Sequence, residues 1–219
     1  MLIACWSSKG GSGTTVVAAA LAVALSGPSS GSSPGGVVFA DFCGDGPAVL
    51  GVPEPEGPGL SDWLAAGDDV PPDGISRLEV DVTRGLTLLA RGSLPFHAGR
   101  AAALAAAFAA DTRPVVADCG TLVDEAAQVV AANAARSLLV VRPCFLALRR
   151  ALLARVRPSG VVLVHEAGRA LGGRDVEEVL GVPVRARVEC LPEVARMVDA
   201  GLLTSRLPRR MVRALRGAA

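Results

Sequence analysis

The stretch SSKGGSGTT at residues 7–15 combines three glycines with a lysine and two adjacent threonines. Glycines at this density let backbone N–H groups turn toward one centre, where they can bind phosphate oxygens. The usual phosphate-binding pattern, G-x-x-x-x-G-K-[ST], has a lysine immediately before its last hydroxyl residue. In this chain Thr14 stands at that position, and a lysine, Lys9, comes five residues earlier. The segment indicates phosphate binding by a loop that departs from the usual pattern. The alternative is an ordinary glycine-rich turn.

Lys9 is the only lysine in a chain that carries 22 basic residues. The other basic residues are all arginine, so the bias toward arginine did not extend to this position. The place of the single lysine inside the glycine loop therefore favours a specific role for its side chain.

The elements around the loop follow from the spacing of apolar residues. An apolar run at 2–6 precedes the loop, and an alanine-rich run without a breaker follows it, which predicts a strand, a loop and a helix. The remaining pattern predicts strands at 37–41, 86–92, 114–120, 137–143, 160–166 and 182–188, and helices near 61–66, 98–110 and 124–135. Nearly continuous apolar strands that alternate with helices predict an α/β fold: a three-layer, doubly wound, mostly parallel sheet with helices on both faces.

Two acidic residues stand at the ends of predicted strands, Asp41 after the second and Asp118 after the fourth. Ligands in open α/β sheets bind at the carboxyl ends of the strands, so we expect both acids near the glycine loop. The combined chemistry suits a nucleoside triphosphate with Mg²⁺. The backbone of Gly10, Gly11 and Gly13 would surround the phosphates, and the Thr15 hydroxyl and the Asp118 carboxylate would hold the metal.

Length and composition predict a single domain over residues 1–219, because 51% of the residues are hydrophobic and only 20% are charged. The Ser-, Gly- and Pro-rich segment 26–36 predicts a flexible surface loop. Neither a signal peptide nor a transmembrane run is indicated, so we expect a cytoplasmic protein. The five cysteines are widely spaced and form no C-x-x-C pair, so they indicate neither a disulfide framework nor a zinc site.

The charge is unevenly distributed along the chain. Residues 1–135 hold 6 basic and 14 acidic side chains, whereas residues 136–219 hold 16 basic and 7 acidic ones. The basic half can meet an anionic partner, either a membrane surface or nonspecific DNA. Residues 204–219 contain five arginines and no acid and predict a basic C-terminal helix. The alternative is a closing helix whose apolar side packs on the sheet.

The segment SKGGSGTT resembles the deviant Walker A motif, K-G-G-x-G-K-T, of the MinD/ParA ATPases. The resemblance extends along the chain: VVFADFCGDGPAVLGV is similar to the switch I segment of that family, LTLLARGS to the strand before the central helix, RPVVADCGTL to the Walker B and switch II segment, and VLGVPVRARVECLPEVARMVDAGLL to the final strand and its adenine-side loop. Within the family, the wording of the loop most resembles the TadZ/CpaE branch, which localises pilus-assembly machinery and is described as septum-site-determining-like.

The resemblance implies roles for individual residues. Lys9 matches the signature lysine, which reaches the nucleotide held by a partner subunit, and Asp41 matches the first acid of switch I, near the magnesium. The nucleotide-binding residues implied are Lys9, Gly10, Gly11, Ser12, Gly13, Thr14, Thr15, His165 and Pro192; the metal ligands are Thr15, Asp41 and Asp118; and the catalytic residues are Lys9, Asp41 and Asp45.

Three positions depart from the family pattern. Thr14 replaces the lysine that neutralises phosphate charge, and Cys43 replaces the second acid of switch I, which orients the attacking water. Asp45 is a substitute only if its side chain turns toward the phosphate. His165 stands where the family has an adenine-contacting asparagine. These departures predict weak or no hydrolysis, since catalysis of phosphoryl transfer rests on positioning and electrostatics.

We therefore expect an ATP-binding positioning switch with Mg²⁺, which forms an ATP-sandwich homodimer and is at most a slow ATPase. It would localise a pilus, secretion or septum-associated machine through a protein cargo, and be recruited to a pole, the septum or the inner membrane surface. The main alternative is an active ParA-type ATPase for DNA or cargo partitioning. A scaffold that has lost nucleotide binding is a third hypothesis, which Lys9, Thr15, Asp41 and Asp118 argue against.

Overall fold

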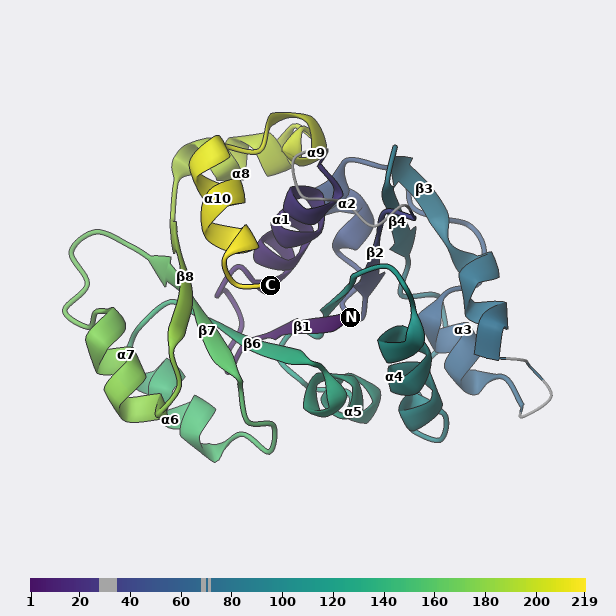
Figure 1. Ribbon diagram of the computed structural model, residues 1–219, viewed down its shortest axis with the longest axis horizontal. Coiled ribbons are helices and arrows are strands. Elements are labelled where there is room, and N and C mark those ends of the chain that lie inside the picture. The colour runs from purple at the N-terminus through teal and green to yellow at the C-terminus, as the bar shows by residue number, and fades with distance from the viewer. Residues whose placement is uncertain (28–34, 68–69, 71) are drawn as a thin grey trace.

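The apolar runs of the sequence form one eight-stranded sheet in a computed structural model that describes residues 1–27, 35–67, 70 and 72–219 (Figure 1). The strands are β1 (Leu2–Trp6), β2 (Val37–Asp41), β3 (Val80–Thr83), β4 (Leu86–Leu89), β5 (Val115–Asp118), β6 (Arg136–Val141), β7 (Gly160–His165) and β8 (Val184–Glu189). Their order across the sheet is β3-β4-β2-β5-β1-β6-β7-β8.

All neighbouring strands are parallel except β3, which pairs antiparallel with β4 at one edge. The predicted α/β fold with a mostly parallel sheet is confirmed. The sequence did not predict β3, because three of its four residues are exposed and it contains no apolar run. An edge strand with one paired side needs little apolar burial.

Helices cover both faces of the sheet (Figure 1). One layer contains α1 (Thr14–Ser26), α2 (Gly46–Leu50), α8 (Pro192–Asp199), α9 (Leu203–Arg206) and α10 (Arg209–Arg216). The other contains α3 (Leu60–Ala65), the 3-10 helix η2 (Pro72–Leu78), α4 (Ala101–Ala110), α5 (Glu125–Asn133), α6 (Phe145–Leu153) and α7 (Gly173–Leu180). None of the described helices is long and apolar enough to span a bilayer.

The central strand β1 shows how one short run serves both layers. Ile3 and Cys5 pack in the core beneath α1, while Leu2, Ala4 and Trp6 pack in the core on the other face. Side chains alternate between faces along a strand, so burial on both sides requires every residue of β1 to be apolar. This arrangement fixes the end of β1, where the glycine loop begins.

The C-terminal segment differs from its predicted form. In place of one helix over 204–219, α9 and α10 are separated by Leu207 and Pro208, and Leu207 has a ψ of 125°, which is not helical. A residue that precedes proline disfavours the helical conformation, which accounts for the break. The predicted loop at 26–36 falls largely on residues 28–34, which lie outside the described residues.

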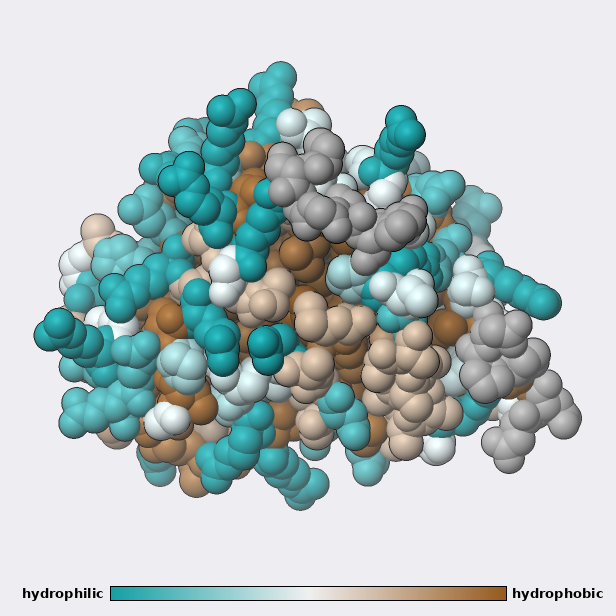
Figure 2. All heavy atoms as spheres, in the orientation of Figure 1, coloured by the Kyte–Doolittle hydropathy of each residue, from teal (hydrophilic) through white to brown (hydrophobic). Residues whose placement is uncertain are grey.

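The apolar side of α10 faces the protein. Met211 and Leu215 are buried in the core beside α1, so the sequence alternative of a closing helix is the one observed. Figure 2 shows hydrophilic side chains over the outer side of this part of the molecule. Of its arginines, Arg210 pairs with Glu189 and Glu193, and Arg216 donates a hydrogen bond to the Ala24 carbonyl.

The buried position of α10 predicts a large effect of truncating Leu215. Leu215→Ala should lower the free energy of unfolding by about 2–5 kcal/mol, because the side chain is fully buried and its loss leaves a cavity. The matched control Leu153→Ala, which truncates a leucine that is 76% exposed, should change it by less than about 0.5 kcal/mol. Urea unfolding measures both, and equal effects would contradict the packing of α10 on α1.

Candidate functional site

The glycine loop joins the end of β1 to the start of α1 at the carboxyl edge of the sheet. Gly11 and Gly13 have φ values of +74° and +81°, a region that residues with a side chain rarely adopt. A Cβ atom added at Gly10, Gly11 or Gly13 would meet no atom within 4 Å. These glycines therefore serve the backbone conformation and leave open space above the loop, where a ligand can approach closely.

Carbonyl oxygens of the loop have hydrogen-bond partners, whereas two of its N–H groups have none in the described part of the chain. The Lys9 carbonyl accepts hydrogen bonds from the hydroxyls of Ser7 and Ser12, each at 3.0 Å, and the Gly11 carbonyl accepts one from Arg142 Nη1 at 3.4 Å. Among the described residues, nothing accepts a hydrogen bond from the N–H groups of Gly11 and Gly13. Free N–H groups beside the N-terminus of a 13-residue helix form an anion site.

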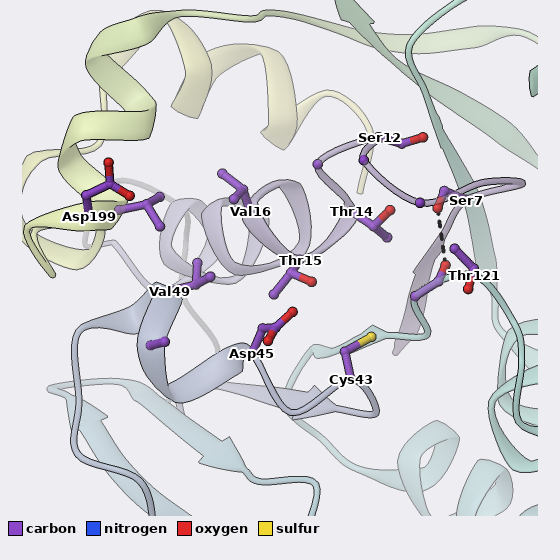
Figure 3. A pocket seen from close by; sticks show the side chains of 16 residues that line it. Ser7, Ser12, Thr14, Thr15, Val16, Cys43, Asp45, Val49, Thr121 and Asp199 are labelled. Atoms are coloured by element: carbon purple, nitrogen blue, oxygen red, sulfur yellow. Dashed lines mark hydrogen bonds between the residues drawn. The ribbon is translucent and has the colours of Figure 1, made fainter.

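A cavity of about 650 Å³ lies above this loop, within the size range of small-molecule sites (Figure 3). It brings together most of the residues predicted to bind a nucleotide, together with Cys43 and Asp45 from the segment after β2. The side chains of Asp45 and Thr15 point toward one another across it (Figure 3). The lining residues are Ser7, Gly10, Gly11, Ser12, Gly13, Thr14, Thr15, Val16, Cys43, Asp45, Ala48, Val49, Gly120, Thr121, Val198 and Asp199.

The two predicted metal ligands Asp41 and Asp118 lie side by side at the ends of β2 and β5; they do not line the cavity themselves, although Cys43 and Gly120, which follow them in the chain, do. They are direct partners in the parallel pairing of β2 with β5, and both are fully buried. Among the described residues, neither carboxylate has a basic partner. The strand register therefore places two acidic side chains together at the carboxyl edge of the sheet.

The two carboxylates differ in their hydrogen bonds. Asp41 accepts three from backbone N–H groups, those of Cys43 at 2.8 Å, Gly44 at 2.9 Å and Gly46 at 2.7 Å. Asp41 thus holds the following segment in a tight turn. One oxygen of Asp118 accepts from the Gly120 N–H at 3.2 Å, whereas the other, Oδ2, has no partner among the described residues. A buried carboxylate oxygen that accepts no hydrogen bond is suited to bind a metal cation.

Burial raises the pKa of both acids. For Asp118 the pKa rises to about 6, because burial and the neighbouring charge of Asp41 outweigh the side chains of Thr15 and Cys43 and the Gly120 N–H group, which favour the ionised form. The pKa of Asp41 is also raised by burial, against the three N–H groups, which favour its ionised form. A divalent cation would supply the missing counter-charge, so the donor set fits the predicted Mg²⁺ site of Thr15, Asp41 and Asp118.

Lys9 belongs to the loop but does not line the cavity. Its Nζ donates a hydrogen bond to the Gly10 carbonyl at 3.3 Å, and it has no ion-pair partner within the described part of the chain. The preceding residue is held in place, since the Ser8 hydroxyl donates to the Ala147 carbonyl of α6 at 2.7 Å. The single lysine therefore lies at the loop with its charge uncompensated.

A second, mostly apolar cavity of about 290 Å³ adjoins the first and shares Gly13, Val16, Val198 and Asp199 with it. It lies between α1, the ends of β7 and β8, and α8, and is suited to a planar base. His165 and Pro192, predicted to bind the nucleotide, do not line either cavity, although their neighbours Val164 and Leu191 line the second. Val198 and Asp199 lie in the segment whose resemblance implied an adenine-side loop, but they were not named as site residues, since a short amphipathic helix does not reveal which side faces a ligand.

The raised pKa of Asp118 predicts how stability depends on pH. An unfolded aspartate titrates near pH 4 and the folded one near pH 6, so the folded chain loses stability as pH rises through this window. Asp118→Asn should therefore raise the free energy of unfolding by about 3 kcal/mol at pH 7 and have little effect at pH 4.

Urea unfolding with a chelator present measures this effect. The matched control Asp81→Asn, at an exposed acid, should leave the pH profile unchanged. A less stable Asp118→Asn variant at pH 7 would contradict the account of an uncompensated carboxylate.

Neither a protein-family model nor a curated protein sequence matches this chain. Several solved structures, in contrast, match nearly the whole chain. A ParA family ATPase from Chlorobium tepidum TLS superposes with a TM-score of 0.79 at 19% identity, covering 98% of this chain and 96% of that one. The septum site-determining protein MinD from Pyrococcus horikoshii OT3, complexed with Mg-ADP, gives 0.78 at 18% identity, covering 99% and 93%.

A putative plasmid partition protein from Borrelia burgdorferi B31, bound to AMPPNP, gives a TM-score of 0.70 at 14% identity and covers 99% of this chain and 96% of that one. At these identities the likeness is one of fold. The chain therefore has the fold of the MinD and ParA structures, in agreement with the fold predicted from its sequence.

Proposed function

We propose that this chain is an ATP-binding positioning switch of the MinD/ParA type, which dimerises when it binds ATP with Mg²⁺. The observation that carries the proposal is the pairing of a glycine loop with free N–H groups and a single lysine that lies outside the cavity of its own chain. A lysine so placed is available to the phosphates held by a second copy.

Binding of the nucleotide would use both cavities. The N–H groups of Gly11 and Gly13, with the N-terminus of α1, would hold the phosphates. Thr15 and the unpartnered Asp118 Oδ2 would hold Mg²⁺, which supplies charge neutralisation at the phosphates when bound. The apolar second cavity would take the base, with the Asp199 carboxylate at the junction of the cavities, where ribose hydroxyls can donate to it.

Dimerisation would follow from charge. Each Lys9 would donate charge-assisted hydrogen bonds to the phosphates of the partner, and the terminal phosphate of ATP offers oxygens that ADP lacks. Binding that favours one association state shifts the equilibrium toward it, so ATP would act as the link between two copies.

Hydrolysis would be slow or absent. Thr14 lines the cavity where a lysine would neutralise phosphate charge, and the neutral thiol side chain of Cys43 replaces a carboxylate that would orient water. Asp45 is the remaining acid at the cavity, and its side chain points toward Thr15. It is the residue we assign to any residual activity as a general base.

The cellular role we infer is localisation of a pilus, secretion or septum-associated machine, as in the TadZ/CpaE branch. Its cargo would be a protein. The buried apolar side of α10 disfavours insertion of this helix into a membrane, whereas the exposed Arg209 and Arg213 suit contact with an anionic surface. The alternative, an active ParA-type ATPase, requires phosphate release that accelerates with DNA.

Lys9→Ala tests the proposal most sharply among single variants. It should keep the fold and ATP binding by the monomer, and it should weaken ATP-dependent dimerisation by about a hundredfold or more, because two charge-assisted contacts are lost in a symmetric dimer. Analytical ultracentrifugation with Mg-ATP measures the dimer, and a fluorescent ATP analogue measures binding.

The matched control is Arg174→Ala, which removes one exposed cation elsewhere. It should dimerise as the wild type does. Undiminished dimerisation of Lys9→Ala would rule out the role proposed for the single lysine.

A further inference from the structure

Three side chains at the carboxyl ends of β2 and β5 converge on one point. They are Asp41, Cys43 and Asp118, and each offers one ligand atom within 4.8 Å of the others. We propose that this trio binds a thiophilic divalent cation, of the class of Zn²⁺, in the absence of nucleotide.

The unsatisfied oxygen of Asp118 points to a ligand that the protein itself does not provide. Asp118 is fully buried, and its Oδ2 has no hydrogen-bond partner among the described residues. Burying a polar oxygen without a donor destabilises the folded chain, and a bound cation would remove that penalty. Asp118 Oδ2 can therefore bind a metal without first losing a hydrogen bond.

Cys43 is held beside this carboxylate by the backbone. Its Sγ lies 3.8 Å from the Asp118 carbonyl, and a Cβ atom at Gly120 would lie only 2.6 Å from the sulfur. Gly120 also has a φ of +56°, so any larger residue would be both strained and in collision with the thiol. The glycine after Cys119 thus leaves the space that the sulfur occupies, while the sulfur stays accessible from the cavity (Figure 3).

Asp41 provides a fixed third ligand. The three N–H groups of Cys43, Gly44 and Gly46 orient its carboxylate and stabilise its ionised form. Asp41 Oδ2 accepts a hydrogen bond only from the Gly46 N–H group among the described residues. This oxygen therefore keeps a lone pair for a metal. The turn that Asp41 holds is the same turn that presents Cys43, which couples the positions of the two ligands.

The sulfur and the two carboxylates of the trio determine which metal ion it prefers. Ligand atoms of a tetrahedral zinc site are separated by about 3.5 Å, given bond lengths of about 2.0–2.3 Å, so a small rotation of the exposed Cys43 side chain would close the trio. On binding, the thiol proton passes to solvent and the sulfur forms the metal bond as a thiolate. One thiolate and two carboxylates favour zinc or cobalt, whereas magnesium requires an oxygen octahedron.

This site shares Asp41 and Asp118 with the proposed Mg²⁺ site, but it needs no nucleotide. A cation bound by Cys43 would tie the turn after β2 to the end of β5 and compete with Mg-ATP for the same carboxylates. The consequence is a nucleotide-free form whose metal must leave before ATP binds productively.

The test is a titration of the chelator-treated full-length chain with Co²⁺ in the absence of nucleotide and oxygen. Binding through Cys43 should produce a thiolate-to-cobalt charge-transfer band in the near ultraviolet, and Zn²⁺ should abolish the band by displacement. Cys43→Ser should remove the band and weaken Zn²⁺ binding by more than about tenfold. Mutation of a residue that only contacts a metal ligand already lowers metal affinity by about that factor.

The matched control is Cys190→Ser, which alters the other exposed thiol and should keep the band. Cys43→Asp should lose the band and gain affinity for Mg²⁺, because it replaces sulfur by oxygen. A thermal unfolding curve for each variant distinguishes lost metal binding from a lost fold.

The proposal is overturned if the wild type shows no charge-transfer band, if Cys43→Ser retains it, or if Cys190→Ser loses it. A fluorescent ATP analogue in Mg²⁺, tested on a separate aliquot of the chelator-treated chain to which no Co²⁺ is added, separates this outcome from failure of the proposed function. ATP binding without the cobalt band rejects the thiophilic site alone, and the band without ATP binding rejects the nucleotide switch alone.

Discussion

The site depends on two buried carboxylates that face each other without a counter-charge. The parallel register of β2 and β5 makes Asp41 and Asp118 direct partners, and no basic side chain of the described residues reaches either one. Burial is the main cause of the raised pKa of Asp118, and the neighbouring charge of Asp41 adds to it. A bound cation would offset this repulsion, which is the physical basis of the cation site proposed at the two carboxylates.

The glycine loop supplies the complementary half. Its free N–H groups are suited to anions, and the carboxylates beneath are suited to cations, so a metal-phosphate ligand satisfies both halves together. The loop retains its anion site, and the positive charge that remains, on Lys9, lies outside the cavity of its own chain.

The sequence predicted the parts of this arrangement that depend on local composition. Apolar runs gave the sheet, and the acids at the ends of two runs gave the floor of the site, because parallel strands end at one edge. The sequence could not predict that Val198 and Asp199 of α8 complete the cavity, since that depends on how α8 docks beside α1. His165 and Pro192 lie next to residues that line the second cavity, one position away from it in each case. Pro208 marks the break between α9 and α10, whereas the spacing of apolar residues on both sides of it predicts one helix.

The most direct test of the switch is the solution mass of the wild-type chain by light scattering without nucleotide, with Mg-ADP and with Mg-ATP. The account predicts a monomer in the first two conditions and a dimer only in Mg-ATP, because only the terminal phosphate completes the contacts of two Lys9 side chains. The same mass in all three conditions, together with no detectable ATP binding, would contradict the account and leave the site without a nucleotide.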